Sequence, residues 1–137
     1  MNKVVLITGG ARGIGSAIAL ELAKHGYDIV INYLTSKQPA KELKEKIESQ
    51  YHVRCLTICA DVSDVDQVNI MVSEIEEKMG GVDVLINNAA VDLSNLFHLK
   101  NAEEFKRTLD VNVVGAFNCS KRVYKHMLDQ EYGRIIN

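Results

Sequence analysis

The chain has 137 residues, of which 47% are hydrophobic and 25% charged, and its net charge at neutral pH is −2. This length favours a single domain with a buried core, and the charge balance offers no basic surface for nucleic acid. The amino-terminal apolar run breaks at paired glycines too early for a signal peptide, and no stretch approaches the roughly 18 apolar residues of a membrane span. We therefore expect a cytoplasmic protein with neither a nucleic-acid nor a membrane partner.

Short apolar runs alternate along the chain with longer segments of helical periodicity. The expected strands cover 3–8, 27–33, 52–60, 82–88 and the residues from Gly133 onward. The expected helices run from Ile14 to Gly26, from Ser36 past Ile47, from a capping box at Ser63 and Asp66 to Gly80, and from Asn101 through Met127. Such alternation predicts an α/β fold, a doubly wound parallel sheet of about five strands with helices on both faces.

Apolar spacing also predicts which face of each helix is buried. The expected stripes are Ile14, Ala17, Ile18 and Leu22 in the first helix, Ala40, Leu43 and Ile47 in the second, and Phe105, Leu109, Asn112, Ala116, Cys119, Val123 and Met127 in the last. The pair Ile135 and Ile136 is expected to begin a buried fifth strand.

A glycine-rich turn, TGGARGIG at residues 8–15, lies between the first expected strand and helix. In such a sheet ligands bind beyond the carboxyl ends of the strands, and glycines followed by a helix amino terminus suit a phosphate. A Walker-type loop is excluded because Gly15 is followed by Ser16 without a lysine, and the G-x-G-x-x-G order is also absent. The alternative is that the glycines serve only a tight turn and close helix packing.

A metal site is not expected. His52, Cys55 and Cys59 lie close together, but in a strand-like stretch without the tight turn that ligands need, so buried strand residues are the favoured interpretation. Three cysteines without a framework spacing suit a reducing compartment.

Four ordered motifs resemble those of the short-chain dehydrogenase/reductase family. TGGARGIG resembles its T-G-x-x-x-G-x-G cofactor loop, and Asp61-Val62 resembles its adenine-contacting pair. Residues 87–90, NNAA, resemble its N-N-A-G motif, with Ala90 in place of the final glycine, and DVNVVGAF at 110–117 resembles the helix that carries a catalytic-site Asn. The resemblance spans the whole chain, and VINYLTSK and AFNCSK are similar to the 3-oxoacyl-[acyl-carrier-protein] reductases within the family.

The resemblance implies a Rossmann-type dinucleotide-binding domain over residues 1–137, truncated at its fifth strand. The residues expected to bind the cofactor are Thr8, Gly9, Arg12, Gly13, Ile14, Gly15, Asn32, Tyr33, Lys37, Asp61, Val62, Asn88, Ala89 and Ala90.

The expected cofactor is NADP(H). An NAD site of this type needs a carboxylate at the end of the second strand, where this chain has Asn32 and Tyr33. Arg12 in the glycine loop, together with Lys37 after the strand, provides positive charge for a 2′-phosphate instead. The alternative is that both are solvated surface charges.

Family chemistry implies hydride transfer assisted by a Tyr, a Lys and a Ser. The single Tyr-x3-Lys match, Tyr33 to Lys37, lies on the adenosine side of the expected site, so a catalytic role is not assigned to it. By resemblance, Asn112 helps to hold a proton-relay water, the alternative being a satisfied core Asn. The family's Ser and Tyr-x3-Lys would follow Asn137.

Three interpretations of the whole chain remain open. The first is the amino-terminal half of an NADP(H)-dependent oxidoreductase, inactive alone, whose full-length form is a homo-oligomer acting on a small or acyl-carrier-bound carbonyl substrate. The second is a non-catalytic nucleotide-binding module or subunit. The third is a chain that pairs with another that supplies the rest of the site.

Overall fold

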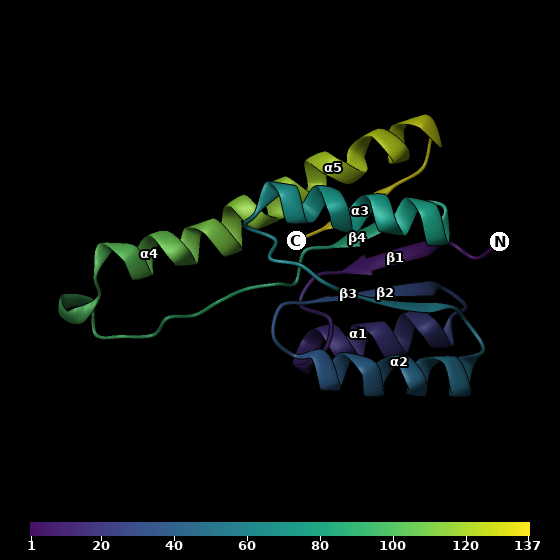
Figure 1. Cartoon of the computed structure of the whole chain (residues 1–137), viewed down its shortest axis with the longest axis horizontal. Coiled ribbons are helices and arrows are strands. Elements are labelled where there is room, and N and C mark those ends of the chain that lie inside the picture. The colour runs from purple at the N-terminus through teal and green to yellow at the C-terminus, as the bar shows by residue number, and fades with distance from the viewer.

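The five strands form one parallel sheet in the order β3-β2-β1-β4-β5 (Figure 1). The computed structural model describes residues 1–137. The strands are β1 (Val4–Ile7), β2 (Asp28–Tyr33), β3 (Cys55–Cys59), β4 (Val84–Ile86) and β5 (Arg134–Ile136). The predicted doubly wound α/β fold is confirmed.

Helices cover both faces of the sheet. They are α1 (Gly13–Lys24), α2 (Lys37–Tyr51), α3 (Val65–Met79), α4 (Ala102–Leu109) and α5 (Gly115–Asp129), with a 3-10 turn η1 (Phe97–Leu99) and a π-helical segment η2 (Asp110–Val114). Helices α1 and α2 lie on one face, and α3 and α5 lie on the other (Figure 1). None of the helices is both long and apolar enough to cross a bilayer.

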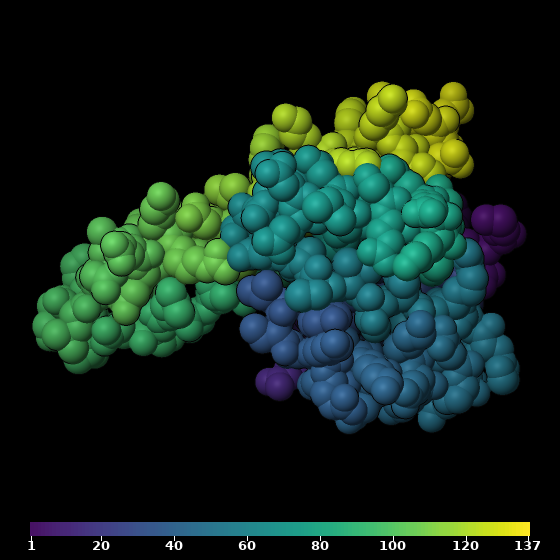
Figure 2. Space-filling view, in the orientation of Figure 1, coloured from purple at the N-terminus to yellow at the C-terminus, as the bar shows by residue number.

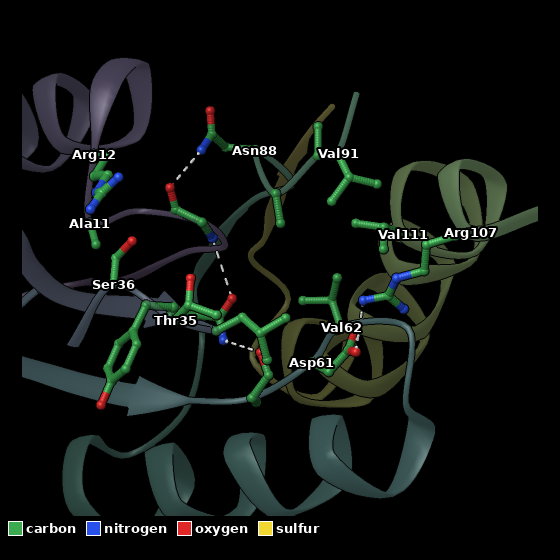
Figure 3. Close-up of a pocket in the computed structure, with 17 residues that line it drawn as sticks. Ala11, Arg12, Thr35, Ser36, Asp61, Val62, Asn88, Val91, Arg107 and Val111 are labelled. Carbon is green, nitrogen blue, oxygen red and sulfur yellow. Dashed lines mark hydrogen bonds and ion pairs between the residues drawn. The ribbon is translucent and has the colours of Figure 1, made fainter. Parts of the chain in front are cut away.

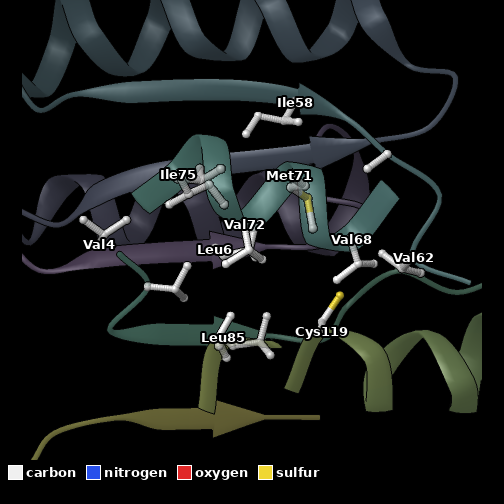
Figure 4. Close-up of a cluster of buried hydrophobic side chains, with 14 of the residues drawn as sticks. Val4, Leu6, Ile58, Val62, Val68, Met71, Val72, Ile75, Leu85 and Cys119 are labelled. Atoms are coloured by element: carbon white, nitrogen blue, oxygen red, sulfur yellow. The ribbon is translucent and has the colours of Figure 1, made fainter. Parts of the chain in front are cut away.

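Two apolar cores form because the sheet is covered on both faces. Every residue of β1 is buried, with alternate side chains in the two cores. On the α3 side, Leu6 and Leu85 pack with Met71, Ile75 and Cys119 (Figure 4). The strand order reverses between β1 and β4, which places the topological switch point at their carboxyl ends.

The buried face of α1 differs from the predicted stripe. The buried residues are Gly15, Ala19 and Ala23, whereas Ile14 is 75% exposed. Small side chains let the helix lie close to the sheet, so the larger Ile18 is only half buried beside the contact. The stripe predicted for α2 is confirmed, since its three members are all buried.

The predicted capping box of α3 is wrong. Asp64 is the cap, and its carboxylate accepts hydrogen bonds from the backbone N–H groups of Asp66 at 2.9 Å and Gln67 at 3.2 Å. Ser63 lies one residue too early and bonds instead to Asp61. Asn101, predicted as the cap of the last helix, is confirmed as the N-cap of α4, where it forms a capping box with Glu104.

The long last helix is not a single buried rod. Segment η2 separates α4 from α5, and α4 projects from the body as an arm (Figures 1 and 2). Phe105 and Leu109 are exposed because no element lies beside them, and Asn112 is exposed as well. Only the α5 part of the predicted stripe packs on the sheet, through Cys119, Val123 and Met127.

Strand β5 is not buried, contrary to the expectation from Ile135 and Ile136. It is an edge strand paired only with β4, and all three of its residues are exposed. The face of β4 and β5 beside α1 is open as an apolar groove of about 520 Å³, which includes Leu22, Val84 and Ile136.

Replacing a core residue of α3 tests this packing. Ile75→Ala should lower the free energy of unfolding by about 2 to 5 kcal/mol, because Ile75 is 0% exposed and its loss leaves a cavity. Ile70→Ala on the same helix, where the side chain is 69% exposed, is the matched control and should have little effect. Urea unfolding measures both, and equal losses for the two variants would contradict the assigned core.

Candidate functional site

A cleft of about 340 Å³ opens at the carboxyl ends of β1 to β4 (Figure 3). It is formed by the glycine-rich turn after β1, the segments that follow β2, β3 and β4, and one face of α4 and η2. Nine of the residues predicted from the sequence line it: Gly9, Arg12, Asn32, Tyr33, Asp61, Val62, Asn88, Ala89 and Ala90. The structure thus brings together residues from four separate loops.

Six predicted residues do not line the cleft: Thr8, Gly13, Ile14, Gly15, Lys37 and Asn112. Gly13, Ile14 and Gly15 form the first turn of α1. Lys37 lies beyond the end of β2 in a separate hollow with Gln38 and Lys41, because α2 begins there and turns away from the switch point.

Thr8 joins the turn after β1 to the segment after β4. Its hydroxyl donates to Ile86 O at 3.3 Å and accepts from the backbone N–H groups of Asn88 and Ala89, both at 3.0 Å. The Asn88 amide donates in return to Thr8 O and Gly9 O, both at 3.0 Å. Since Thr8 is only 1% exposed, its role here is to fix the two loops relative to each other.

The glycines of the turn have different roles. A β-carbon on Gly15 would stand 2.7 Å from Asn88 Nδ2 and from Gly9 O, so close packing alone requires glycine there. Gly13 is different, because its φ is +52° and no atom lies within 4 Å of the position of a β-carbon. Its backbone therefore borders open space, and a side chain there would fill it.

The amino terminus of α1 is suited to an anion. Arg12 occupies the N-cap position without a side-chain capping bond, and the first turn has no acidic residue. The free N–H groups and the positive end of the helix dipole are thus left available beside the open backbone of Gly13. This donor set fits the pyrophosphate of a dinucleotide.

Asn32 is part of the frame of the cleft. Its side chain is buried, donates to Ala60 O at 3.0 Å and accepts from Gly9 N at 3.3 Å. The amide therefore ties the glycine-rich turn to the segment after β3. Beyond it, the mouth of the cleft is bordered by Tyr33, Thr35 and Ser36.

Asp61 lies at the opposite end of the cleft and is held by three donors. Oδ1 accepts from Ser63 N at 2.9 Å and Ser63 Oγ at 2.6 Å, and Oδ2 accepts from Arg107 Nη2 at 3.0 Å. Partial burial by itself raises the pKa of the Asp61 carboxyl, but the hydrogen bonds from Ser63 and Arg107 outweigh burial, so its pKa lies below the ordinary value of 3.8. Asp61 is therefore a carboxylate at neutral pH.

Arg107, Val91 and Val111 line the cleft and were missed by the sequence analysis. Arg107 and Val111 are four residues apart and share a helical face, which is the signal that could have indicated them. The predicted stripe assigned a different face to the interior, so this spacing was not assigned to the site.

Asn112 lies in the π-helical segment, and both ends of its amide are used by one residue. Its Oδ1 accepts from Val91 N at 2.8 Å and its Nδ2 donates to Val91 O at 3.0 Å. The amide thus fastens the segment after β4 to η2, while the side chain itself is outside the cleft lining. The buried position predicted for it is wrong, and a catalytic role stays a prediction.

A family model described as short chain dehydrogenase matches residues 3–137. The chain belongs to the short-chain dehydrogenase family. Its members are oxidoreductases that use a nicotinamide cofactor, and the position of the cleft at the switch point agrees with this membership.

Relatives within the short-chain dehydrogenase family include reductases of 3-oxoacyl thioesters. The 3-oxoacyl-[acyl-carrier-protein] reductase FabG of Staphylococcus epidermidis is 42% identical over the whole chain, which covers 56% of that protein. The acetoacetyl-CoA reductase of Paracoccus denitrificans is 35% identical, with 54% of its length covered. The crystal structure of an NAD⁺-bound xylitol dehydrogenase superposes with a TM-score of 0.90 at 30% identity, over 97% of this chain and 51% of the other. The chain thus spans little more than half the length of these relatives.

The ion pair at Asp61 makes a testable prediction about acid titration. In Arg107→Met, the pKa of Asp61 should rise part of the way toward 3.8, because the Ser63 bonds remain. A pKa lowered by folding gives stability that is present above pH 3.8 and is lost as the pH falls through the folded-state value. Carbon-13 NMR titration of the carboxyl measures the change. Arg122→Met, which breaks the distant ion pair with Glu76, is the control; an unchanged Asp61 titration in Arg107→Met would contradict the assignment.

Proposed function

We propose that this chain is the cofactor-binding part of an NADP(H)-dependent oxidoreductase that transfers hydride between the nicotinamide and a carbonyl or alcohol carbon. The observation that supports it most directly is the uncapped amino terminus of α1 beside the open backbone of Gly13, at the edge of a cleft at the switch point. Family membership adds the class of cofactor.

The charges of the cleft favour NADP(H) over NAD(H). Its charged lining residues are Arg12, Asp61 and Arg107. Asp61 and Arg107 form a salt bridge, which leaves Arg12 as the cation without a carboxylate partner. Thr35 and Ser36 add hydroxyl donors near the end of β2, where no carboxylate lines the cleft. This arrangement suits a 2′-phosphate. The likeness to an NAD⁺-bound dehydrogenase concerns the fold and does not distinguish the two cofactors.

The proposed substrate class is a 3-oxoacyl thioester, in a step of fatty acid biosynthesis. Support comes from the two named relatives, a 3-oxoacyl-[acyl-carrier-protein] reductase and an acetoacetyl-CoA reductase, which share a 3-oxoacyl thioester as the group acted on. The full-length form is proposed to be a homo-oligomer. A cytoplasmic location stays a prediction from the sequence.

The chain's own residues position the cofactor and contribute no proton-transfer pair. When bound, the nicotinamide supplies or accepts the hydride. The turn around Gly13 and the N–H groups of α1 would hold the pyrophosphate, Arg12 would hold the 2′-phosphate, and Asp61 would hold the adenine end. Tyr33 lines the cleft and also shares a separate hollow with Lys37 after β2, on the adenosine side of the proposed site, so we assign this pair no catalytic role.

Comparing the two cofactors tests the assigned specificity. The chain should bind NADPH more tightly than NADH, and Arg12→Ala should weaken NADPH binding by about 10- to 100-fold with little change for NADH, since one charge-assisted contact is lost. Lys37→Ala is the matched control and should have a small effect, because Lys37 does not line the cleft. Isothermal titration calorimetry measures these affinities; tighter binding of NADH by the unmodified chain would refute the NADP(H) assignment.

Turnover tests the proposed division between binding and chemistry. The purified chain should bind NADPH but should not oxidise it in the presence of acetoacetyl-CoA, because its cleft contains no lysine and its one tyrosine is at the adenosine side. The acetoacetyl-CoA reductase of Paracoccus denitrificans is the positive control for the absorbance assay. Oxidation that depends on acetoacetyl-CoA and is catalysed by this chain alone would contradict the proposal. Binding without oxidation would also be the behaviour of a nucleotide-binding module.

A further inference from the structure

The adenine end of the cleft contains a carboxylate whose orientation is fixed from two sides. Ser63 donates twice to Oδ1 of Asp61, and Arg107 donates to Oδ2. Arg107 also donates through Nη1 to Ser63 Oγ at 2.7 Å, which closes a ring of three side chains (Figure 3 shows the Arg107 to Asp61 contact). Rotation of the carboxylate would break bonds to two different residues.

The ring leaves one acceptor direction of Asp61 unused. An ionised carboxylate offers about four lone-pair sites, close to the plane of the group. Ser63 uses two on Oδ1 and Arg107 uses one on Oδ2, so one in-plane site remains on Oδ2. Because Asp61 lines the cleft, we infer that this remaining site is the one that meets a donor from a ligand.

A backbone donor lies next to this acceptor. The N–H of Val62 forms no hydrogen bond within the chain, whereas its carbonyl accepts from Asn118 Nδ2 at 3.0 Å. Val62 also lines the cleft. Asp61 and Val62 thus offer one acceptor and one donor on adjacent residues. The acceptor on Asp61 complements the 6-amino group of adenine, and the N–H of Val62 complements the neighbouring ring nitrogen. Hypoxanthine presents the reverse pattern, a carbonyl oxygen and an N–H.

We propose that Arg107 is a positioning residue for base selection: with Ser63, it orients the Asp61 carboxylate so that the cleft accepts a 6-amino purine and rejects a 6-oxo purine. The inference rests on the proposed function, because it assumes that a purine dinucleotide occupies this cleft. An arginine suits the task because its planar fork donates to both partners at once. A lysine has a single point charge and lacks this fork.

Arg107 also has a structural role that the test must separate. Helix α4 continues directly into η2 and packs appreciably on no other helix or strand, so the bonds of Arg107 to Asp61 and Ser63 join this arm to the body. Loss of Arg107 could therefore loosen the arm without any effect on selection. A ratio of affinities for two ligands that differ only at the base removes this ambiguity, because a general loosening weakens both ligands alike.

The experiment compares binding of NADPH with binding of its hypoxanthine analogue, in which a carbonyl replaces the 6-amino group. The unmodified chain should prefer NADPH by about 10-fold or more, the effect of one hydrogen bond to a charged group. Arg107→Met should reduce this preference by about 3- to 10-fold, mainly through weaker NADPH binding. Arg107→Lys should restore part of the preference, since it keeps the charge but loses the fork.

Two further variants serve as checks. Arg122→Met breaks another arginine–carboxylate contact between helices, with Glu76, but lies away from the cleft and should leave the preference unchanged. Ser63→Ala removes the hydroxyl donor to Oδ1 and keeps the backbone N–H donor, and it should also reduce the preference. This variant decides the matter if Arg107→Met fails to fold in a urea titration.

The outcomes distinguish this inference from the proposed function. If neither dinucleotide binds, the proposed function fails and the inference falls with it. If both bind and the preference is the same in the unmodified chain, Arg107→Met and Ser63→Ala, the inference alone is overturned. A preference for adenine that falls in both variants and persists in Arg122→Met supports it.

Discussion

The hydroxyl of Thr8 is the contact on which the geometry of the cleft depends. It is buried between the glycine-rich turn and the segment after β4, where it donates one hydrogen bond and accepts two. Asn88 completes the network by donating to two carbonyls of the turn. In a buried environment such a satisfied network is strong, and a partly satisfied one is costly. The two loops at the switch point therefore behave as one rigid piece, and Gly15 is required because no side chain fits between them.

The remaining wall of the cleft has a different origin. Arg107 and Val111 belong to the arm and the π-helical segment, which are joined to the body by the Asp61 ring and by the amide of Asn112 on Val91. These contacts are partly exposed, so water competes with them. Each therefore contributes less to the stability of the cleft than the buried hydrogen bonds of Thr8 do. The cleft thus combines a rigid end at the glycine-rich turn with an Asp61 end whose geometry depends on a few polar contacts.

Sequence reasoning succeeded where local rules decide the structure. The five strands, the turn at residues 8–15 and the stripe of α2 follow from apolar period and glycine placement, and the structure has them. Sequence reasoning failed where contacts with residues distant in the sequence determine the packing. The face of α1 depends on how closely the helix approaches the sheet, and the exposure of Asn112 depends on an arm that has nothing beside it. Lys37 lies outside the cleft because α2 turns away from the switch point, which no local pattern indicates. Arg107 was missed because a cation on a helix is ordinarily solvated.

The charged groups of the cleft are consistent with the proposal that this chain binds the cofactor without carrying out proton transfer. Asp61 and Arg107 neutralise each other at the adenine end, so the net positive charge of the lining resides on Arg12 near the uncapped start of α1. If the proposed dinucleotide binds here, its phosphates would be attracted to the Arg12 end and its base would meet the Asp61 end. Proton transfer needs a group whose pKa is shifted toward neutrality, and the lining contains no lysine, histidine or cysteine. Its one shifted carboxyl, Asp61, is displaced away from neutrality, because the surrounding donors stabilise the ion. The hydrogen bonds that hold Asp61 as an ion therefore make it unsuitable as an acid or a base at neutral pH.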